Sequence, residues 1–366
     1  MQINFIDLQA QYKEYSQEID KEIKEVCVNA QFIGGPKLQN FEKNLAEYVG
    51  VKHAIGCSSG TDALLLSLMA LDIKAGDEVI TTPFTFIATA EVIAFLGAKT
   101  VFVDIDEQTY NIDSSKIEAL ITPKTKATMP VSLYGQCADM DAINKIAKEH
   151  DIAVIEDACQ SFGAEYKGEK SCGLSTIGCT SFFPSKPLGG YGDGGAIFTN
   201  DDELSQKIRM LLNHGQNERY KHKYIGINGR LDAMQAAILN VKLKHFDKEV
   251  KERQSIAQRY SDALFTCNLL TPYVKADRTS VFAQYSIRVK DREKAISLLG
   301  EKKIPTAVHY PMPLHLQEAF KDLGYKEGDF PISEKVSQEI MSLPMSPYLS
   351  KEQQDYIVDA LKDIYA

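Results

Sequence analysis

The 366-residue sequence has no excess of positive charge, no long apolar run and no CxxC pair. Its 41 Lys and Arg residues are outnumbered by 50 Asp and Glu residues, and the net charge of −9 argues against a general nucleic-acid binder. No stretch approaches the roughly 18 consecutive apolar residues of a membrane span. The first twenty residues are interrupted by charged side chains and contain no apolar export core, so we expect a cytoplasmic protein.

The seven cysteines form no pattern that would hold a metal ion or a set of disulfide bonds. Their number is odd, and Cys172 and Cys179, which are six residues apart, have no His partner nearby. Zinc sites require Cys and His at closer and more regular spacing. We therefore predict reduced, mostly buried thiols and no metal site.

The first half of the sequence alternates short apolar runs with helical stretches. Strands are predicted at 53–57, 78–81, 100–104, 127–131 and 152–156, with helices near 61–69, 88–96 and 139–150. This alternation predicts an α/β fold with a mostly parallel sheet and helices on both faces. Many of the strands are apolar on both sides, as full burial requires.

The second half changes character after two further short strands near 180–183 and 196–199. A long amphipathic helix is predicted from Leu231 to beyond Tyr260, with further elements at 285–289, 292–299 and 351–364. We expect a large α/β domain over residues 1–240 and a smaller C-terminal α+β domain over 241–366. The N-terminal helix, near 12–28, is expected to pack on the smaller domain or on a partner.

Ligands of open parallel sheets bind where the strands end, so the segments after each strand are candidate sites. Residues 58–62, Ser-Ser-Gly-Thr-Asp, open a Leu-rich helix and offer free backbone N–H groups to a phosphate. Asp157 follows the strand 152–156, and a carboxylate there is costly to bury unless a positive group, such as a protonated ring nitrogen, meets it. For both segments the alternative is an ordinary helix cap.

Lys186 lies between two prolines and beside two aromatic residues, and a glycine-rich loop follows it. Most lysines are solvated, but stiff apolar flanks can hold an amine away from water and make it nucleophilic toward an aldehyde. A phosphate cradle, an acid for a ring nitrogen and a lysine for an aldehyde are together what pyridoxal phosphate requires. These segments therefore predict a pyridoxal-phosphate enzyme.

The glycine run 190–195 also satisfies the spelling GxGxxG. A dinucleotide-binding fingerprint follows a strand and opens a helix, whereas this run precedes the predicted strand 196–199. We therefore reject the dinucleotide fingerprint, which weakens the alternative of a nucleotide-binding oxidoreductase without removing it. No P-loop spelling is present.

Several motifs in register extend the comparison to nearly the whole chain. They are residues 59–64, 85–89, 156–160, 181–186, 192–195, 228–235 and 309–311. Through them the sequence resembles the sugar aminotransferases of the DegT/DnrJ/EryC1/StrS family, a branch of the fold type I pyridoxal-phosphate enzymes. The resemblance implies an aspartate-aminotransferase-like fold and pyridoxal 5′-phosphate as the cofactor.

The resemblance also implies roles for residues of the first half. Lys186 would be the catalytic residue and would bind the cofactor covalently. Asp157 would hold the pyridinium N–H, Gln160 would meet the ring hydroxyl side, and Phe86 would stack on the ring, unless Phe86 is ordinary core. The phosphate would be held by Gly60, Thr61 and Ser181.

Four further residues are implied to come from the neighbouring subunit of a homodimer with shared active sites. Asn228 would reach the phosphate, whereas Arg230, His309 and Tyr310 would face the sugar. The alternatives are a surface ion pair for Arg230 and a satisfied buried imidazole for His309. Ser346 stands where close relatives often have His, while Pro187 and Cys159 are tolerable departures from Asn and Ala.

Residues 131–139 and 186–188 most resemble one subgroup of the family. That subgroup aminates C3 of a UDP-linked 2-acetamido-3-keto-hexuronic acid for bacterial surface polysaccharide, with L-glutamate as the implied amino donor. The alternatives are another UDP- or dTDP-linked 3- or 4-keto-6-deoxy sugar and a non-catalytic regulator on the same fold. Because the substrate is anionic, we expect the basic and aromatic segment 219–224 to cover the partner's site, unless it is a solvated loop.

Overall fold

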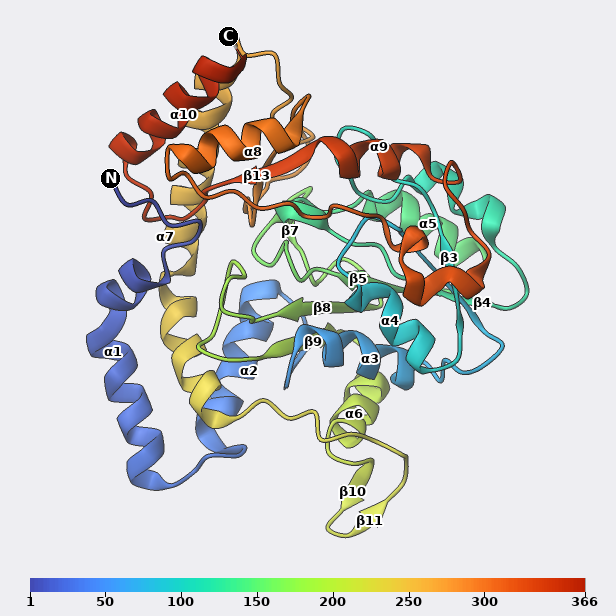
Figure 1. Cartoon of the computed structure of the whole chain (residues 1–366). Helices are drawn as coiled ribbons and strands as arrows, with labels where there is room; N and C mark the ends of the chain where they lie inside the picture. The colour runs from blue at the N-terminus through green and yellow to red at the C-terminus, as the bar shows by residue number, and fades with distance from the viewer. Residues whose placement is uncertain (366) are drawn as a thin grey trace.

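A central seven-stranded sheet organises the computed structural model, which describes residues 1–365 (Figure 1). Across the sheet the strands are β1 (His53–Cys57), β9 (Gly195–Thr199), β8 (Ile177–Ser181), β5 (Ala153–Asp157), β4 (Thr125–Thr128), β2 (Glu78–Thr81) and β3 (Lys99–Phe102). Strand β9 is antiparallel to both of its neighbours, and the remaining pairs are parallel. The predicted, mostly parallel α/β sheet is confirmed.

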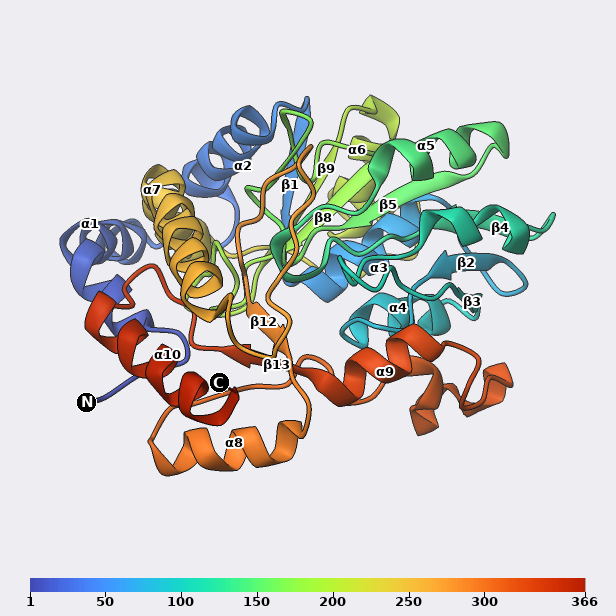
Figure 2. The same ribbon diagram turned by 90° about the horizontal axis from the view of Figure 1, so that it is seen from above.

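Helices cover both faces of this sheet, as Figure 2 shows from above. One apolar core contains residues of α3 (Gly60–Ala70), α4 (Ala88–Phe95) and α6 (Asp202–Leu211), and the other contains residues of α2 (Gly35–Val49), α5 (Met140–Glu149) and α7 (Ala233–Leu264). Successive strand residues alternate between the two cores: Val154 faces the second and Ile155 the first. Because both faces are covered, the strands carry apolar side chains on both sides.

The long helix α7 connects the sheet to a C-terminal core. Its second half packs with β12 (Tyr285–Arg288), α8 (Arg292–Glu301), β13 (Ile340–Leu343) and α10 (Lys351–Tyr365). The proposed boundary between residues 240 and 241 therefore falls inside α7. Helix α1 (Leu8–Asn29) lies against α7, where Tyr15 and Ile19 pack on Ile238 and Val241.

The remaining elements are short connections between these layers. They are α9 (Pro331–Glu339), the hairpins β6–β7 (Glu165–Tyr166, Glu169–Lys170) and β10–β11 (Gln216–Glu218, Lys221–His222), and the 3-10 turns η1 (Ser114–Lys116), η2 (Glu118–Leu120), η3 (Leu133–Gly135), η4 (Leu314–Leu316) and η5 (Glu318–Leu323). The sequence patterns did not indicate α2, α6, α9, β13 or the two hairpins. They also placed the end of β4 too late, because Pro130 has no amide to continue the ladder beyond Thr128.

The predicted thiols and the absence of a metal pattern can be compared directly with the structure. All seven cysteines are free; Cys27 is exposed, Cys159 is half-buried and the others are buried. Among residues 1–365, no group of three or more His, Cys, Asp or Glu side chains is arranged to hold a metal ion. None of the helices in that range combines the length and the apolar character needed to cross a membrane.

Candidate active site

A cavity of about 460 Å³ opens at the carboxyl ends of the parallel strands. The segments after β1, β2, β5 and β8 contribute to its wall, as expected for an open α/β sheet. Nine of the eleven predicted site residues line it: Gly60, Thr61, Phe86, Asp157, Gln160, Ser181, Lys186, His309 and Tyr310. The structure therefore brings together residues from five separate stretches of the sequence.

The start of α3 forms a cradle at one end of the cavity. Ser59 caps the helix by accepting a hydrogen bond from the Asp62 backbone N–H at 3.0 Å. The N–H groups of Gly60 and Thr61 have no partner among residues 1–365 and remain available to a ligand. A Cβ on Gly60 would lie 2.7 Å from that of Ser181, so glycine leaves the needed space. Free amides at a helix start suit a phosphate group.

Asp157, the last residue of β5, is 5% exposed. Its carboxylate accepts hydrogen bonds from the Thr89 hydroxyl at 2.8 Å and from the Cys159 backbone N–H at 3.2 Å. The Thr85 hydroxyl, from the segment before α4, is 3.0 Å from the Thr89 hydroxyl and fixes that donor. Both donors to Asp157 are neutral, so a cationic ring nitrogen fits the unbalanced charge of the carboxylate.

Thr89 lies within the motif 85–89, but the sequence alone does not indicate its contact with Asp157. Its signal is a pair of threonines four residues apart: Thr85 lies in the bend before α4 and Thr89 in the first turn of that helix. Asp157 also differs from its neighbour Glu156, whose side chain points to the opposite side of β5 and receives hydrogen bonds from Ser132 and Ser171. Burial raises the pKa of Glu156.

Lys186 lies on the loop that joins β8 to β9 and is half-buried in the cavity wall. Its backbone N–H donates to the Phe183 carbonyl at 2.8 Å. A Cβ on Gly189 would overlap the Pro184 carbonyl oxygen, so the loop can close tightly only with glycine there. The glycine run leads into β9 and opens no helix, which agrees with our rejection of a dinucleotide fingerprint.

Two side chains of α7 form hydrogen bonds to the loop that carries Lys186. The buried Lys242 ammonium donates to the Gly189 carbonyl at 2.6 Å and lies 4.5 Å from the centre of the Tyr191 ring. Gln235 accepts a hydrogen bond from the Tyr191 backbone N–H at 2.7 Å. Helix α7 therefore fixes the loop that carries Lys186, and no sequence pattern indicates that Lys242 is part of this support.

Tyr310 and His309 approach the cavity from the segment between α8 and η4. The Tyr310 hydroxyl accepts a hydrogen bond from Gln160 Nε2 at 3.1 Å, while Gln160 Oε1 accepts from the Tyr134 backbone N–H. His309 Nδ1 is 3.1 Å from the Ser342 hydroxyl. Burial lowers the pKa of His309, and the positive charge of nearby Lys186 lowers it further.

The expected origin of these two residues is therefore wrong. We predicted that His309 and Tyr310 would enter the site from a partner subunit, but both line the cavity of their own chain. The reason is the long connection after α8, in which Ala307 pairs with Ser342 of β13, at the edge of the two-stranded β12–β13 sheet of the same chain. The alternative prediction for His309 is a buried imidazole that is satisfied by hydrogen bonds. Its contact with Ser342 agrees with that in part, but the ring also contributes to the cavity wall.

Asn228 and Arg230 do not line the cavity of their own chain. Asn228 is exposed, and Arg230 donates a hydrogen bond to the neutral side chain of Asn213 at 2.7 Å. The segment they belong to lies beside the end of β1, where Cys57 pairs with Arg230. Ser346 is buried and also lies outside the cavity wall, so its difference from the expected His does not alter that wall.

Phe86 is not ordinary core, because 54% of its surface is exposed at the cavity. Phe183 lines the same opening and is similarly exposed. Two exposed aromatic side chains at one opening are unfavourable in water and are suited to contact a flat ring or a second protein surface.

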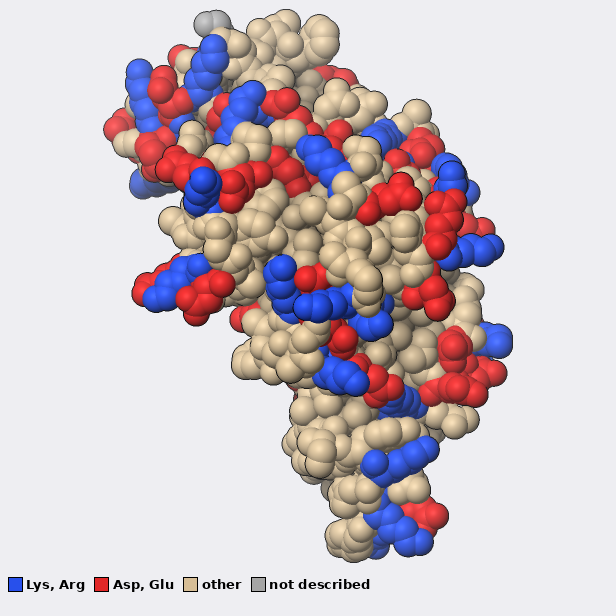
Figure 3. Space-filling view, turned by 90° about the vertical axis from the view of Figure 1, so that its right-hand side faces the viewer, with Lys and Arg blue, Asp and Glu red and all other residues tan. Residues whose placement is uncertain are grey.

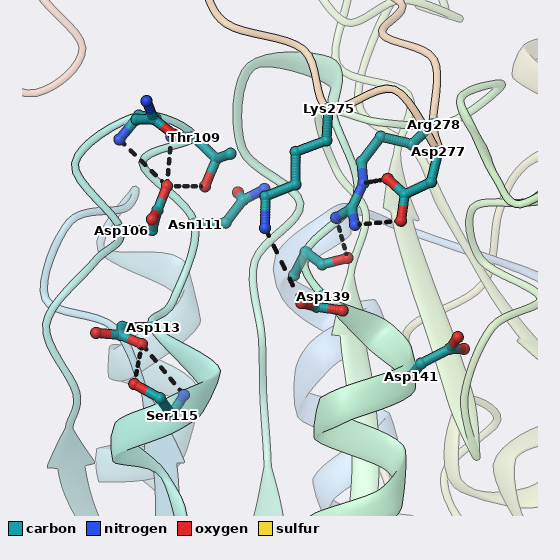
Figure 4. Close-up of polar contacts among 12 residues, drawn as sticks. Asp106, Thr109, Asn111, Asp113, Ser115, Asp139, Asp141, Lys275, Asp277 and Arg278 are labelled. Carbon is teal, nitrogen blue, oxygen red and sulfur yellow. Dashed lines mark hydrogen bonds and ion pairs between the residues drawn. The ribbon is translucent and has the colours of Figure 1, made fainter.

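A polar clamp around Arg278 joins two loops near the active site, and Figure 4 shows Arg278 beside Asp277. The Arg278 guanidinium donates to the carbonyls of Cys137 and Ala138, both at 3.0 Å, and pairs with Asp277 at 2.7 Å. Since the Arg278 side chain is almost fully buried, each of these bonds replaces water that the group has lost. The clamp ties the loop before β12 to the segment between η3 and α5.

The fold and the site together define a class of protein: an α/β enzyme whose helix-start cradle, buried acid and sheet-edge lysine suit pyridoxal phosphate. The sequence profile of the "DegT/DnrJ/EryC1/StrS aminotransferase family" matches residues 13–362. The chain belongs to this family.

Named relatives agree with this assignment. The chain is 53% identical to the UDP-2-acetamido-2-deoxy-3-oxo-D-glucuronate aminotransferase of Pseudomonas aeruginosa, over 95% of this chain and 96% of that protein. It is 48% identical to a protein of Geobacillus stearothermophilus named pleiotropic regulatory protein, over 100% and 99% of the two chains.

Solved structures agree as well. A DegT DnrJ EryC1 StrS aminotransferase from Brucella abortus is 41% identical, with a TM-score of 0.97 and full coverage of both chains. NtdA from Bacillus subtilis, solved with bound cofactor PMP, is 33% identical with a TM-score of 0.90, over 98% of this chain and 83% of that one. The protein is an aminotransferase, and pyridoxal phosphate is its cofactor.

Proposed function

We propose that this enzyme transfers an amino group from L-glutamate to the C3 ketone of a UDP-linked 2-acetamido-3-keto-hexuronic acid. The product would be a 3-amino sugar for surface polysaccharide. The enzyme acts on a nucleotide-linked keto sugar, and the observation that carries the finer assignment is the 53% identity over almost the whole chain to the UDP-2-acetamido-2-deoxy-3-oxo-D-glucuronate aminotransferase.

The cradle, the acid and the aromatic side chain would bind and orient the cofactor. When bound, pyridoxal phosphate supplies an aldehyde that condenses with amines and a ring that withdraws electrons from the neighbouring carbon. The N–H groups of Gly60 and Thr61, with the Ser181 hydroxyl, would hold its phosphate. Asp157 would keep a proton on the ring nitrogen, and Phe86 would cover one face of the ring.

Lys186 would move the proton in both halves of the reaction. Its Nζ would take a proton from the α-carbon of the amino donor and later return one to C3 of the sugar. Anchoring of its loop at Gly189 and Tyr191 holds the lysine backbone against α7 during both transfers. Since donor and sugar use the same site in turn, we expect ping-pong kinetics.

A homodimer would complete each site with Asn228 and Arg230 of the neighbouring chain. Both residues lie outside the cavity of their own chain, at the base of the hairpin β10–β11, which projects from the body in Figure 1. Ile225, between hairpin and site residues, is 91% exposed, as suits a residue covered by another subunit.

The basic segment 219–224 would lie over the partner's nucleotide sugar. It contains Arg219, Lys221 and Lys223, and Figure 3 shows basic side chains on the lower protrusion of the molecule. A chain with a net charge of −9 needs such a local patch to attract a diphosphate and a uronate.

A coupled assay with glutamate and a panel of UDP- and dTDP-linked keto sugars tests the substrate. We expect the highest kcat/KM with the UDP-linked 2-acetamido-3-keto-hexuronate and no turnover by Lys186→Ala. Preference for a neutral 4-keto-6-deoxy sugar would overturn the substrate assignment. Borohydride reduction followed by peptide mass spectrometry should label Lys186 alone, and labelling of another lysine would overturn its role.

Subunit mixing tests the shared site. The Lys186→Ala and Arg230→Ala variants each lack one part of the site, so refolding them together should restore activity that neither has alone. If mixing restores nothing while both variants still form dimers, Arg230 does not act across the interface.

The non-catalytic regulator, the alternative from the sequence, is not favoured, although one relative is named pleiotropic regulatory protein. The presence of Lys186 and Asp157 in one cavity favours catalysis instead. The first half-reaction separates them: an aminotransferase loses its visible absorbance when glutamate is added and forms 2-oxoglutarate, whereas a regulator binds without turnover.

A further inference from the structure

Tyr134 is a buried tyrosine whose backbone has an unusual conformation. It lies in the turn η3 with a φ of 55° and a ψ of 1°, in the left-handed region that residues with bulky side chains rarely adopt. Such a conformation persists only where the surrounding structure holds it, and it is common at functional sites. Tyr134 does not itself line the active-site cavity, so any role it has there is carried by the residues it contacts.

The turn that contains Tyr134 is held by the buried side chain of Asn111. Asn111 Oδ1 accepts a hydrogen bond from the Leu133 N–H at 2.8 Å. Its Nδ2 donates to the carbonyls of Gln136 and Cys137, at 3.1 and 3.2 Å. Asn111 therefore bonds to the chain on both sides of Tyr134, and these bonds fix the direction of the Tyr134 backbone N–H without any ligand.

This N–H determines the orientation of the Gln160 amide. It lies 2.9 Å from Gln160 Oε1, and because a backbone N–H can only donate, the amide oxygen must face it. The amide nitrogen then faces the Tyr310 hydroxyl, which accepts its hydrogen bond at 3.1 Å. Among the hydrogen bonds of residues 1–365, the Tyr310 hydroxyl takes part only in this one. Its own proton is therefore available to a ligand in the cavity.

Tyr134 also reaches Tyr310 by a second route. The Tyr134 hydroxyl donates a hydrogen bond to the His309 carbonyl, which belongs to the peptide bond that joins His309 to Tyr310. Burial raises the pKa of Tyr310, and the negative charge of nearby Asp157 raises it further. The Tyr310 hydroxyl therefore keeps its proton at neutral pH and can act as a donor toward the cavity that it lines.

We propose that Tyr134 is a positioning residue that presents the Tyr310 hydroxyl to the sugar as a hydrogen-bond donor. The inference rests on the proposed function, in which Tyr310 faces the sugar. The backbone N–H of Tyr134 sets the direction of the hydrogen bonds through Gln160, and its hydroxyl fixes the peptide bond before Tyr310. The group that meets Tyr310 must be an acceptor, which an oxygen atom of the sugar supplies.

The experiment uses Tyr134→Phe, which removes the hydroxyl and keeps the backbone N–H. L-Glutamate and the UDP-linked 2-acetamido-3-amino-hexuronate react with the same form of the cofactor, so single-turnover loss of its absorbance gives a second-order rate constant for each. The rate constant with the sugar should fall about tenfold or more, because the segment that carries Tyr310 loses one of its two anchors. The rate constant with glutamate, which has no sugar ring to meet Tyr310, should stay near the wild-type value.

Two results with Tyr134→Phe would overturn the inference. The first is a wild-type rate constant with the sugar, even where urea unfolding shows that the hydroxyl stabilises the fold. The second is an equal fall with both compounds, because Tyr134 would then support the cofactor site as a whole. Tyr110→Phe is the matched control: Tyr110 is buried, its ring packs edge-on against that of Tyr134 with the centres 5.9 Å apart, and it lies outside the cavity wall. It should keep both rate constants.

A double variant tests whether Tyr134 acts through Tyr310. In a Tyr310→Phe background the hydroxyl to be positioned is gone, so Tyr134→Phe should lower the rate constant with the sugar by a smaller factor than it does in the wild type. An undiminished fall would show that Tyr134 acts through another group and would overturn the inference.

The two proposals fail in different ways. If the wild type does not react with the acetamido sugar but reacts with another amino sugar, the substrate assignment is wrong, and the Tyr134 comparison is made with that sugar instead. If the wild type reacts with the acetamido sugar and Tyr134→Phe reacts equally fast, only the role of Tyr134 is wrong.

Discussion

The buried ammonium of Lys242 should make the stability of this enzyme depend on pH. Lys242 lies on α7, is 3% exposed, and bonds to the Gly189 carbonyl on the loop that carries Lys186. Burial lowers its pKa from 10.5 to about 8, although the nearby charge of Glu249 acts in the opposite direction. The Lys242→Met substitution removes the titrating group while keeping an unbranched side chain of similar length.

The sign and size of the effect follow from the two pKa values. Below pH 8 Lys242 is protonated in both the folded and the unfolded chain, and the free energy of the folded chain includes the full cost of burying that charge. Between pH 8 and 10.5 the unfolded chain binds more protons, so the wild type gains stability as the pH rises. A shift of this size corresponds to about 3 kcal/mol. Tyr191, whose pKa burial raises to about 12, stays protonated throughout that window.

Urea unfolding of the holoenzyme at about pH 7, 9 and 11 measures this difference. The free energy of unfolding of the wild type, relative to Lys242→Met, should rise by about 3 kcal/mol across the series. Lys248→Met is the matched control, since Lys248 lies on the same helix with a side chain that is 65% exposed. Parallel pH profiles for the wild type and Lys242→Met would refute the reasoning.

Three further substitutions test the supports of the site. In Gly195→Ala the new Cβ would overlap the carbonyl oxygen of Ser59, the residue before the phosphate cradle. Cofactor affinity, measured by absorbance titration, should therefore fall about tenfold or more, and an unchanged affinity would contradict this. Thr89→Val removes a donor to Asp157 at constant shape, and the rate of the glutamate half-reaction should fall about tenfold, whereas a wild-type rate would show that the hydroxyl is dispensable. Arg278→Met leaves two carbonyls without their donor and should lower the free energy of unfolding, measured in urea, by about 3 kcal/mol. A loss near zero would show that the clamp does not stabilise the fold.

The sheet and the catalytic end of the site could be predicted because their signals are local. Apolar runs identify buried strands, and the polar residues that follow them must meet at the carboxyl edge of a parallel sheet. This logic placed Asp157 and Lys186 in one cavity although they are distant in the sequence. Element ends were less certain, as the early end of β4 at Thr128 shows.

Contacts between distant segments could not be predicted in this way. The bond from Lys242 to Gly189 joins residues 53 positions apart, and a lysine in an amphipathic helix looks like any solvated lysine. The segment 309–310 was recognised from its motif, but no local pattern reveals whether a loop returns to its own sheet or crosses to a partner. Only the three-dimensional path of the chain after α8 decided that question.

The difference between local sequence signals and long-range contacts also separates the residues proposed for the chemistry from those proposed to select the sugar. The residues that would handle cofactor and proton follow strands of the sheet, where a buried scaffold fixes them within short stretches of sequence. His309 and Tyr310 come instead from the C-terminal third of the chain and lie in the same wall through long-range contacts. We therefore expect a change of keto sugar to need new side chains on these later segments or on the proposed partner segment around Arg230, with the lysine, the acid and the cradle kept in place. Motifs of the sheet edge therefore identify an aminotransferase, whereas the identity of its sugar depends on segments that long-range contacts bring to the cavity.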